Sequence, residues 1–268
     1  MSLPGVYKTT LKDGTISYRA SITHQKKHIS LGSYPEEKTA HAAYLLAFSV
    51  LSDMAHKIHD YEQSLPLSFE KWVVLINLRD NGIYFATPIY LMKTYFLYYL
   101  EPELELKFDL EDLFYYASHK IMRRGGHLFV ADYGMQVTLS SRYGIKNYAV
   151  QGKDFQFING DSYDFRYENI KILNSYHGVS LIRRKGSVLY RARIHIRSYY
   201  LIGYYDSAIE AAIAYNKAVD IVKERCPEKN YEMNYITELK ASDYADIYKQ
   251  VAVSEKIYSF SAKKPCKP

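Results

Sequence analysis

An internal repeat constrains the fold of this chain more than any other feature of its sequence. The segment that opens with Gly5-Val6 recurs from Gly178-Val179, an offset of 173 residues (178 minus 5) that narrows to 171 (215 minus 44) at Tyr44 and Tyr215. The other matching pairs, in the same order, are Tyr18-Arg19-Ala20 with Tyr190-Arg191-Ala192, Ile22 with Ile194, Gly32 with Gly203, and Tyr34 with Tyr205. A repeat of this kind predicts one supersecondary unit that occurs twice.

Each copy has the pattern of a small antiparallel sheet followed by a helix. In the first copy Ala20 and Ile22 face one way and the polar residues around them face the other, with a period of two. Asp13-Gly14 predicts a tight hairpin turn. In the second copy Asp206 or Ser207 can cap a helix whose small-residue stripe is Ala208, Ala211, Ala212 and Tyr215. We therefore expect an α+β fold with two units, each a three-stranded antiparallel sheet with one helix across its back.

A sheet that a helix covers on one side leaves its other face to solvent. In the second copy this face would carry Arg191, Arg193 and His195, and the adjoining turns and strands carry Arg183, Arg184, Lys185 and Arg197. In the first copy it would carry Tyr7, Arg19, Ser21, Thr23 and His28, with Lys26 and Lys27 in a turn. Residues 177–225 hold nine Lys or Arg against four Asp or Glu, a net charge of +5 in a chain whose net charge is +6. Such faces predict contact with the major groove of double-stranded DNA, and the alternative is an ordinary solvated sheet.

The repeated residues resemble the AP2 DNA-binding domain, known from plant transcription factors and from bacterial and phage endonucleases. The matching features are the opening Gly-Val, the "YRA.I" strand, the "LG.Y" or "IG.Y" turn and the "A..AA.AY" helix. In that family the sheet face reads the major groove. The resemblance implies the following readers here: Tyr7, Arg19, Ser21, Thr23, His28, Arg191, Arg193, His195 and Tyr199. The family's tryptophans and most first-strand arginines are missing, so the GC-rich target preference of the plant proteins is not expected.

The segment between the copies resembles an HNH homing-endonuclease domain in which two working residues have changed. "FQFINGDSYDFRYENIKIL" is similar to the family's "VDHINGD..DNR.ENLRI", which forms a ββα hairpin around one divalent metal. The metal-binding Asp position is Gln156, and the water-activating His position is Phe157. Neutral Gln is a poor ligand for a hard cation, and Phe can neither bind metal nor accept a proton. The resemblance thus implies no catalytic residue, no metal site and no cofactor.

The sequence suggests five segments. They are an AP2-like domain at 1–62, a helical, aromatic-rich segment at 63–108, the degenerate HNH-like domain at 109–176, a second AP2-like domain at 177–225, and a helical tail with a disordered end at 226–268. Residues 109–145 are expected to form a helix followed by two strands. The most apolar window, residues 83–100, includes Pro88 and Lys93, so a buried helix or helix pair is favoured over a membrane span.

Together these features favour a sequence-specific double-stranded DNA-binding protein, a transcriptional regulator descended from an HNH–AP2 homing endonuclease that has lost catalysis. An active metal-dependent HNH nuclease or nickase is one alternative. A protein-binding inhibitor module is another. The expected partner is DNA, with a homodimer possible and no membrane. Cys226 and Cys266 lie outside any CxxC spacing and the first residues lack a signal-peptide pattern, so a cytoplasmic, nucleoid-associated location is expected.

Overall fold

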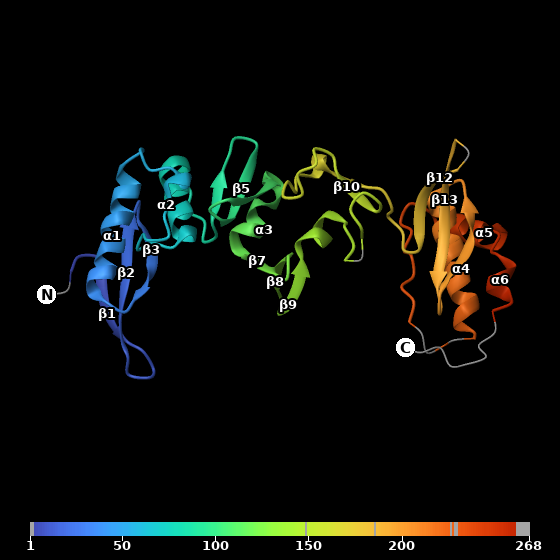
Figure 1. Ribbon diagram of the computed structural model, residues 1–268, viewed down its shortest axis with the longest axis horizontal. Helices are drawn as coiled ribbons and strands as arrows, with labels where there is room; N and C mark the ends of the chain where they lie inside the picture. Colours follow the sequence, from blue (N-terminus) through green and yellow to red (C-terminus); the bar gives the residue numbers. More distant parts are fainter. Residues whose placement is uncertain (1–2, 148, 185, 226, 228–229, 261–268) are drawn as a thin grey trace. The chain divides into compact units, whose positions relative to one another are not determined.

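The computed structural model describes residues 3–260, apart from 148, 185, 226 and 228–229 (Figure 1). The chain divides into two compact units, which are described separately. The first unit comprises residues 1–143 and 161–169, and the second comprises residues 144–160 and 170–268. All sheets are small and antiparallel, with two or three strands each, and they alternate with helices. The expected α+β class is therefore confirmed.

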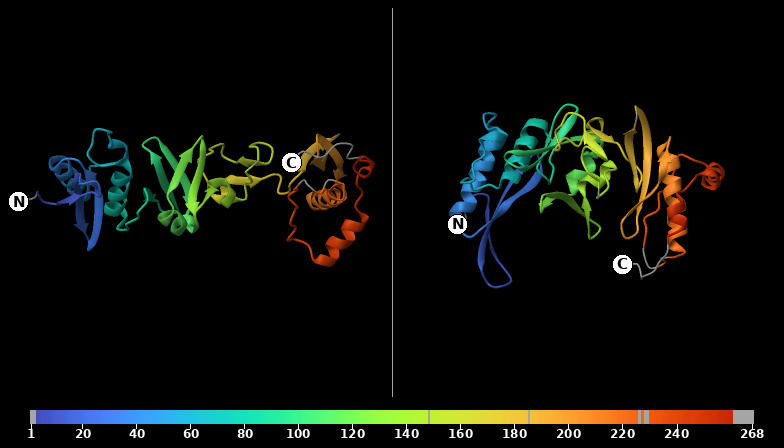
Figure 2. Two further views of the ribbon diagram at one scale, coloured as in Figure 1. Left: turned by 90° about the horizontal axis from the view of Figure 1, so that it is seen from below. Right: turned by 45° about the vertical axis from the view of Figure 1, so that its right-hand side comes forward.

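The first unit begins with a three-stranded sheet backed by a helix. The strands are β1 (Val6–Thr10), β2 (Ile16–His24) and β3 (Lys27–Tyr34), in the order β1-β2-β3, and the helix is α1 (Glu37–Ser52). Ala40, Ala43 and Ala47 are fully buried, so that α1 lies close against one face of the sheet. Two further views show the helix and the sheet as two layers (Figure 2).

The second unit contains the same arrangement. The strands are β12 (Val179–Arg184), β13 (Ser187–His195) and β14 (Tyr199–Tyr205), and the helix is α4 (Ala208–Lys223). Of the two expected capping residues, Ser207 is the cap: its Oγ accepts a hydrogen bond from the amide of Glu210 at 3.1 Å. The prediction of a three-stranded sheet and one helix in each copy is confirmed.

The matched glycines and tyrosines of the repeat make the same contact in both units. Gly5 and Gly178 both have φ +73°, a conformation that favours glycine. A Cβ at Gly5 would lie 2.1 Å from the ring of Tyr44, and a Cβ at Gly178 would lie 2.3 Å from the ring of Tyr215. The central strands also share a β-bulge at matched positions, Ala20/Ser21 and Ala192/Arg193. The repeated residues thus encode one backbone shape.

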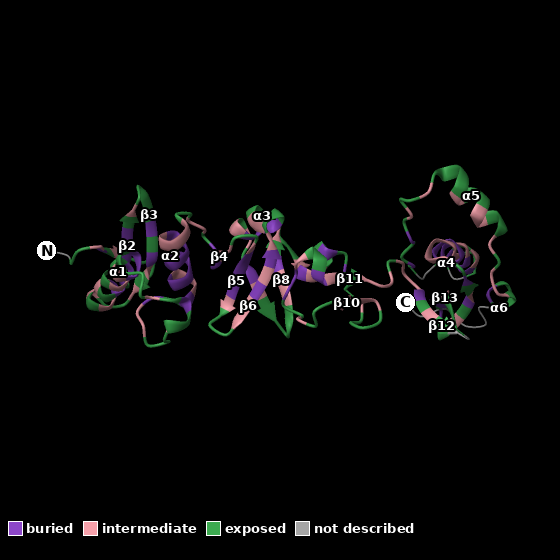
Figure 3. Ribbon diagram, turned by 90° about the horizontal axis from the view of Figure 1, so that it is seen from above, coloured by how far each residue is buried: buried purple, intermediate pink, exposed green. Residues whose placement is uncertain are grey.

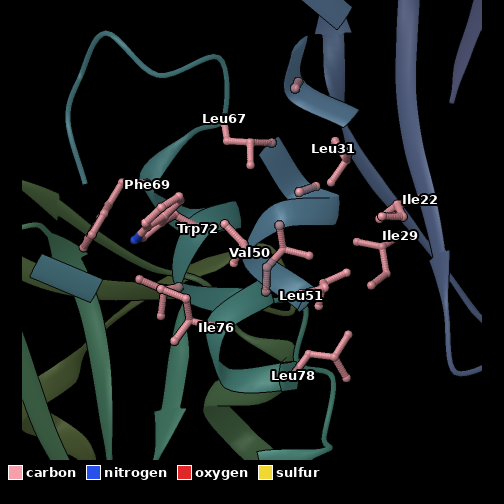
Figure 4. Packing of buried hydrophobic residues seen from close by; sticks show 14 of the residues in the cluster. Ile22, Ile29, Leu31, Val50, Leu51, Leu67, Phe69, Trp72, Ile76 and Leu78 are labelled. Atoms are coloured by element: carbon pink, nitrogen blue, oxygen red, sulfur yellow. The ribbon is translucent and has the colours of Figure 1, made fainter. Parts of the chain in front are cut away.

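The structural repeat extends beyond the matched sequence to a further helix in each unit. The Tyr34 hydroxyl donates to the carbonyl of Pro66 at 2.7 Å, and the Tyr205 hydroxyl donates to the carbonyl of Ala252 at 2.6 Å. A serine-capped helix follows each carbonyl: α2 (Phe69–Asn81) after Ser68, and α6 (Glu255–Tyr258) after Ser254. Figure 4 shows Trp72 and Ile76 of α2 packed beside Val50 of α1.

The expectation that residues 63–108 are helical is wrong beyond Asn81. Gly82, at φ +70°, ends α2, and a second sheet follows with strands β4 (Ile89–Leu91), β5 (Tyr95–Glu101) and β6 (Leu104–Asp109). Asn77 fixes this change of direction, because its Oδ1 accepts from the amide of Leu91 and its Nδ2 donates to the carbonyl of Ile83. Strand β5 is largely buried, so its apolar run lacks the alternation that would have marked it as a strand.

A third sheet completes the first unit. Short helical turns at η2 (Leu110–Asp112) and α3 (Leu113–Ser118) precede strands β7 (Ile121–Arg124), β8 (His127–Asp132) and β9 (Met135–Thr138), and η3 (Leu139–Tyr143) follows. Residues 109–145 therefore form a helix and three strands, not the two that the sequence predicted. The two hairpin turns have positive φ angles at Gly125-Gly126 and Tyr133-Gly134, as type I′ turns require.

The expected ββα hairpin lacks its helix. Strands β10 (Phe155–Phe157) and β11 (Ile170–Ile172) pair in the second unit, and the turn η4 (Tyr167–Asn169) belongs to the first. Because β12 begins at Val179, there is no room for a helix after β11. The side chain of Asn174 also holds the connection extended, since its Oδ1 accepts from the amide of Leu181 at 2.8 Å.

The tail packs on the second unit. Helix α4 lies between the sheet and α5 (Ala241–Gln250), as Figure 3 shows. Ile257 and Phe260 are buried in the core beneath α4. Among its described residues, the tail that was expected to be helical forms helices only at Ala241–Gln250 and Glu255–Tyr258, and the expected disordered end, from residue 261, lies outside them. Within the described part of the chain, every helix is too short or too polar to span a membrane.

Candidate nucleic-acid interface

The free face of the first sheet, opposite α1, presents an exposed aromatic and an exposed arginine side by side. Tyr7 on β1 and Arg19 on β2 are cross-strand partners, and the Tyr7 side chain is 61% exposed. Thr23 and His28, a second cross-strand pair, are also exposed. The structure therefore brings four of the expected readers to one accessible surface.

Ser21 is a correction to that surface. It is only 8% exposed, because the short side chain sits on the central strand at the β-bulge with a neighbouring strand on each side. Its amide donates to the carbonyl of Gly5 at 3.0 Å. Sequence alternation placed Ser21 on the correct face, but its burial leaves little of the side chain accessible to DNA.

The turn between β2 and β3 presents two lysines in different ways. Gln25 and Lys26 have φ angles of +47° and +64°, which indicates a type I′ turn that matches the twist of the strands. Lys26 and Lys27 are both exposed. The Lys27 ammonium lies 5.0 Å from the ring centre of Tyr84, a cation–π contact that holds this charge beside the sheet.

The free face of the second sheet, opposite α4, carries a more ordered group of cationic and aromatic side chains. The Arg193 guanidinium lies 4.9 Å from the ring centre of Tyr199, and the His195 ring meets the same tyrosine edge-on at 5.0 Å. Arg191 donates to the Ser180 hydroxyl at 3.4 Å and leaves its Nε without a partner among the described residues. Tyr199 is 69% exposed. We call Arg191, Arg193, His195 and Tyr199 the reading group.

The remaining basic residues of the second copy do not join the reading group. Arg183 is exposed near the end of β12. Arg197 is a correction, because its guanidinium lies 5.8 Å from the ring centre of Phe260, which belongs to the core on the helix side of the sheet. The expected contacts of Lys185 and of the Arg184 side chain lie outside the described residues.

The acidic and amide residues that matched the nuclease pattern have structural roles in the first unit. Asp164 is fully buried and accepts hydrogen bonds from Nε and Nη2 of Arg166 at 2.9 and 2.6 Å. This pairing raises the pKa of Arg166. Buried Asn169 donates to the Asp164 carbonyl at 2.8 Å, and Phe165 donates through its amide to the Lys107 carbonyl on β6 at 2.8 Å. These residues fasten the loop to the sheet.

Replacing Asp164 by Ala should lower the free energy of unfolding of the first unit by about 3 kcal/mol, because it leaves Arg166 without its buried partner. Trp72, the chain's single tryptophan, is buried in that unit and reports its unfolding in urea. Glu168→Ala is the matched control. Glu168 is the other ion-pair partner of Arg166, and the Glu168 side chain is 75% exposed. We expect less than about 1 kcal/mol there. Equal losses would contradict a structural role for the buried pair.

The two changed positions of the nuclease pattern lie on β10. Gln156 and Phe157 are half-buried and pair with Lys171 and Ile170 on β11. Across the described residues, no group of three or more His, Cys, Asp or Glu side chains is arranged to hold a metal ion.

Arg142 and Tyr143, in η3, form a hydrogen-bonded network around a buried carboxylate. Arg142 and Tyr143 donate to the carboxylate of Asp112 at 2.7 and 2.8 Å, and Asp112 is only 1% exposed. The Tyr143 hydroxyl also meets that of Tyr116 at 3.2 Å, and burial raises the pKa of Tyr143. The sequence did not single out Asp112, because one acid among several carries no mark of burial. The polar groups of Arg142 and Tyr143 that bind Asp112 are thus engaged within the first unit.

A hollow of about 390 Å³ lies beside the reading group, within the second unit. Its lining residues include Arg193, His195 and Tyr199 of the reading group and also Lys146 and Lys153. Neither lysine was predicted to contact DNA, because both stand in a segment whose positive and negative charges otherwise nearly balance. We call this space the linker hollow.

Comparison of the chain with protein-family models, with curated proteins and with solved structures gave no significant match. The geometry of the two sheets is therefore the basis for assigning a function.

Proposed function

We propose that this protein binds double-stranded DNA sequence-specifically through the free faces of its two repeated sheets, and that it acts as a transcriptional regulator without cutting DNA. The observation that carries the proposal is the reading group: two arginines, a histidine and a tyrosine gathered on the sheet face that α4 leaves uncovered. The resemblance of both repeats to AP2 domains supports the same conclusion.

The chemistry of the reading group suits the edges of base pairs. Arginine donates two parallel hydrogen bonds to guanine in the major groove, and a two-stranded or three-stranded ribbon fits that groove. Tyr199 holds the Arg193 guanidinium in place from 4.9 Å, which reduces the entropy lost on binding. Half-buried Arg191 donates through Nη2 to the Ser180 hydroxyl at 3.4 Å, a contact that orients a second guanidinium beside Arg193.

A chain with two DNA-binding surfaces is suited to act as a transcriptional regulator. The first sheet offers Tyr7, Arg19, Thr23 and His28, and the second offers the reading group. Tethering two weak binding surfaces raises the total affinity without any new contact, provided that both can engage one duplex. The chain has both surfaces, whereas Gln156 and Phe157 supply no metal chemistry. This combination favours DNA binding over DNA cutting.

Selection from a random duplex pool with the full chain tests the proposal. We expect an enriched sequence, bound with an affinity that falls steeply as salt rises. Absence of an enriched sequence, together with weak and salt-insensitive binding, would contradict the proposal and favour a protein-binding module.

Incubation with supercoiled plasmid and Mg²⁺ or Mn²⁺ tests the nuclease alternative. We expect no metal-dependent nicking. Asn169→Ala is a poor probe of any such activity, because Asn169 is buried and holds the loop at 161–169. Gln156→Ala is better suited, and nicking that this substitution abolishes would overturn the proposal.

A further inference from the structure

The linker hollow joins the free face of the second sheet to the segment that precedes it. Arg193 on β13 and Tyr199 on β14 line it together with Lys146, Lys153 and Asp154, which precede the sheet in the chain. All of these residues belong to the second unit, so their arrangement is fixed within one compact body. The hollow is continuous with the reading group because three residues belong to both.

The charges that line the hollow favour an anion. Lys146, Lys153 and Arg193 supply three positive charges, and Asp154 is the one acidic residue among the lining residues that the structure describes. The Asp154 carboxylate accepts from the amide of Val150 and from Asn174 Nδ2, both at 2.9 Å. The net charge of the lining is therefore +2 with its histidines neutral, and its acid is engaged in holding the backbone.

His177 adds no charge to this balance near neutral pH. Burial lowers the pKa of His177; Glu232 raises it and Lys146 lowers it, to a smaller extent. The permanent cations of the hollow are therefore the two lysines and Arg193.

Hydrogen bonds hold the backbone that lines the hollow at Lys153 and Asp154. Asn174 donates to the Lys153 carbonyl at 2.8 Å, and its Oδ1 accepts from the amide of Leu181 on β12 at 2.8 Å. The amides of Leu173 and Asn174 both donate to the Asp154 carbonyl, at 2.8 and 3.0 Å. Asn174 therefore fastens the backbone at Lys153 to β12, the edge strand of the second sheet.

We infer that the linker hollow is a phosphate-binding site, in which Lys146 and Lys153 hold a backbone phosphate of the DNA whose bases meet the reading group. This inference rests on the proposed function and adds a second kind of contact to it. Base-edge contacts select a sequence, whereas phosphate contacts set position and bind all sequences alike. The hollow has a volume of about 390 Å³, and the residues that it shares with the reading group would place the phosphate next to the bases being read.

Lys146→Ala with Lys153→Ala tests the inference. We expect the slope of log K against log salt to become less steep by about 2, and the affinity at 0.1 M salt to fall roughly 10- to 100-fold. The loss should be equal for the selected duplex and for a mismatched one. Fluorescence anisotropy of labelled duplexes at several KCl concentrations measures both quantities. Lys240→Ala with Lys256→Ala is the control, because it removes two exposed charges from the tail that packs on the helix side.

The outcomes separate this inference from the proposed function. A wild-type slope in the Lys146/Lys153 variant, with wild-type protein binding the selected duplex, would overturn the inference and leave the proposed function intact. If wild-type protein binds no duplex at all, both the proposed function and the inferred site for a DNA phosphate are overturned. Titration with adenosine monophosphate then shows whether the hollow takes a free nucleotide: binding that the variant loses would retain the phosphate site with a different source, and no binding would remove it.

Discussion

Alanine at both Arg191 and Arg193 is expected to abolish sequence-specific DNA binding while the second unit stays folded. A well-placed arginine contributes about 1–3 kcal/mol of discrimination at a guanine, so loss of both corresponds to roughly 30-fold to 20,000-fold in affinity for the selected duplex. The fold should tolerate the change, since both side chains lie on the face that α4 does not cover. Within the described part of the chain, Arg191 donates to Ser180 and Arg193 lies over the ring of Tyr199.

Anisotropy with the selected duplex and a scrambled one measures the loss of discrimination, and circular dichroism monitors the fold. Arg197→Ala is the matched control, because it removes an arginine from the same sheet whose guanidinium stacks on Phe260 instead. We expect that control to keep wild-type discrimination. An unfolded double variant, or equal loss for both duplexes, would contradict a base-reading role for Arg191 and Arg193.

The repeated units could be predicted from the sequence because each of their special residues has one dominant physical cause. Gly5 and Gly178 sit where φ is +73° and a tyrosine ring fills the space of a side chain. The alternation through Ala20 and Ile22 follows from burial on one face of a central strand. Where local geometry alone decides the role of a residue, the sequence pattern is sufficient.

Other features depend on contacts that no local pattern contains. Ser21 follows the alternation but is buried between two neighbouring strands, and Arg197 lies in a turn whose direction only the structure sets. The apolar run at 83–100 has the length of a helix, yet Asn77 redirects it into a sheet through contacts with Ile83 and Leu91. A buried run without alternation fits either structure.

The residues at 158–169 show that a pattern of acidic and amide side chains can have a structural cause alone. Asp164, Arg166 and Asn169 satisfy one another and fasten a loop to β6. Gln156 and Phe157 lie outside that loop and pair with Lys171 and Ile170 on β11. Stability of the loop is therefore sufficient to explain the residues at 164, 166 and 169.

Gly178→Ala is expected to destabilise the second unit by about 2–5 kcal/mol. The new Cβ would lie 2.3 Å from the ring of Tyr215 and 2.6 Å from the carbonyl oxygen of Arg193. Tyr215 is only 1% exposed and cannot turn aside into solvent. Overpacking of this kind costs about 1–3 kcal/mol, and an alanine held at positive φ adds about 1–2 kcal/mol.

Gly152→Ala separates the two causes, because Gly152 lies in the same unit at φ +80° with no heavy atom within 4 Å of the added Cβ. It should show only the backbone cost. Urea unfolding followed by far-ultraviolet circular dichroism reports the whole chain, whereas fluorescence of Trp72 reports the first unit. Gly178→Ala should therefore shift the dichroism transition without shifting the tryptophan transition, and Gly5→Ala, whose Cβ meets Tyr44, should shift the tryptophan transition. Equal effects of Gly178→Ala and Gly152→Ala would show that the contact with Tyr215 does not constrain the second unit.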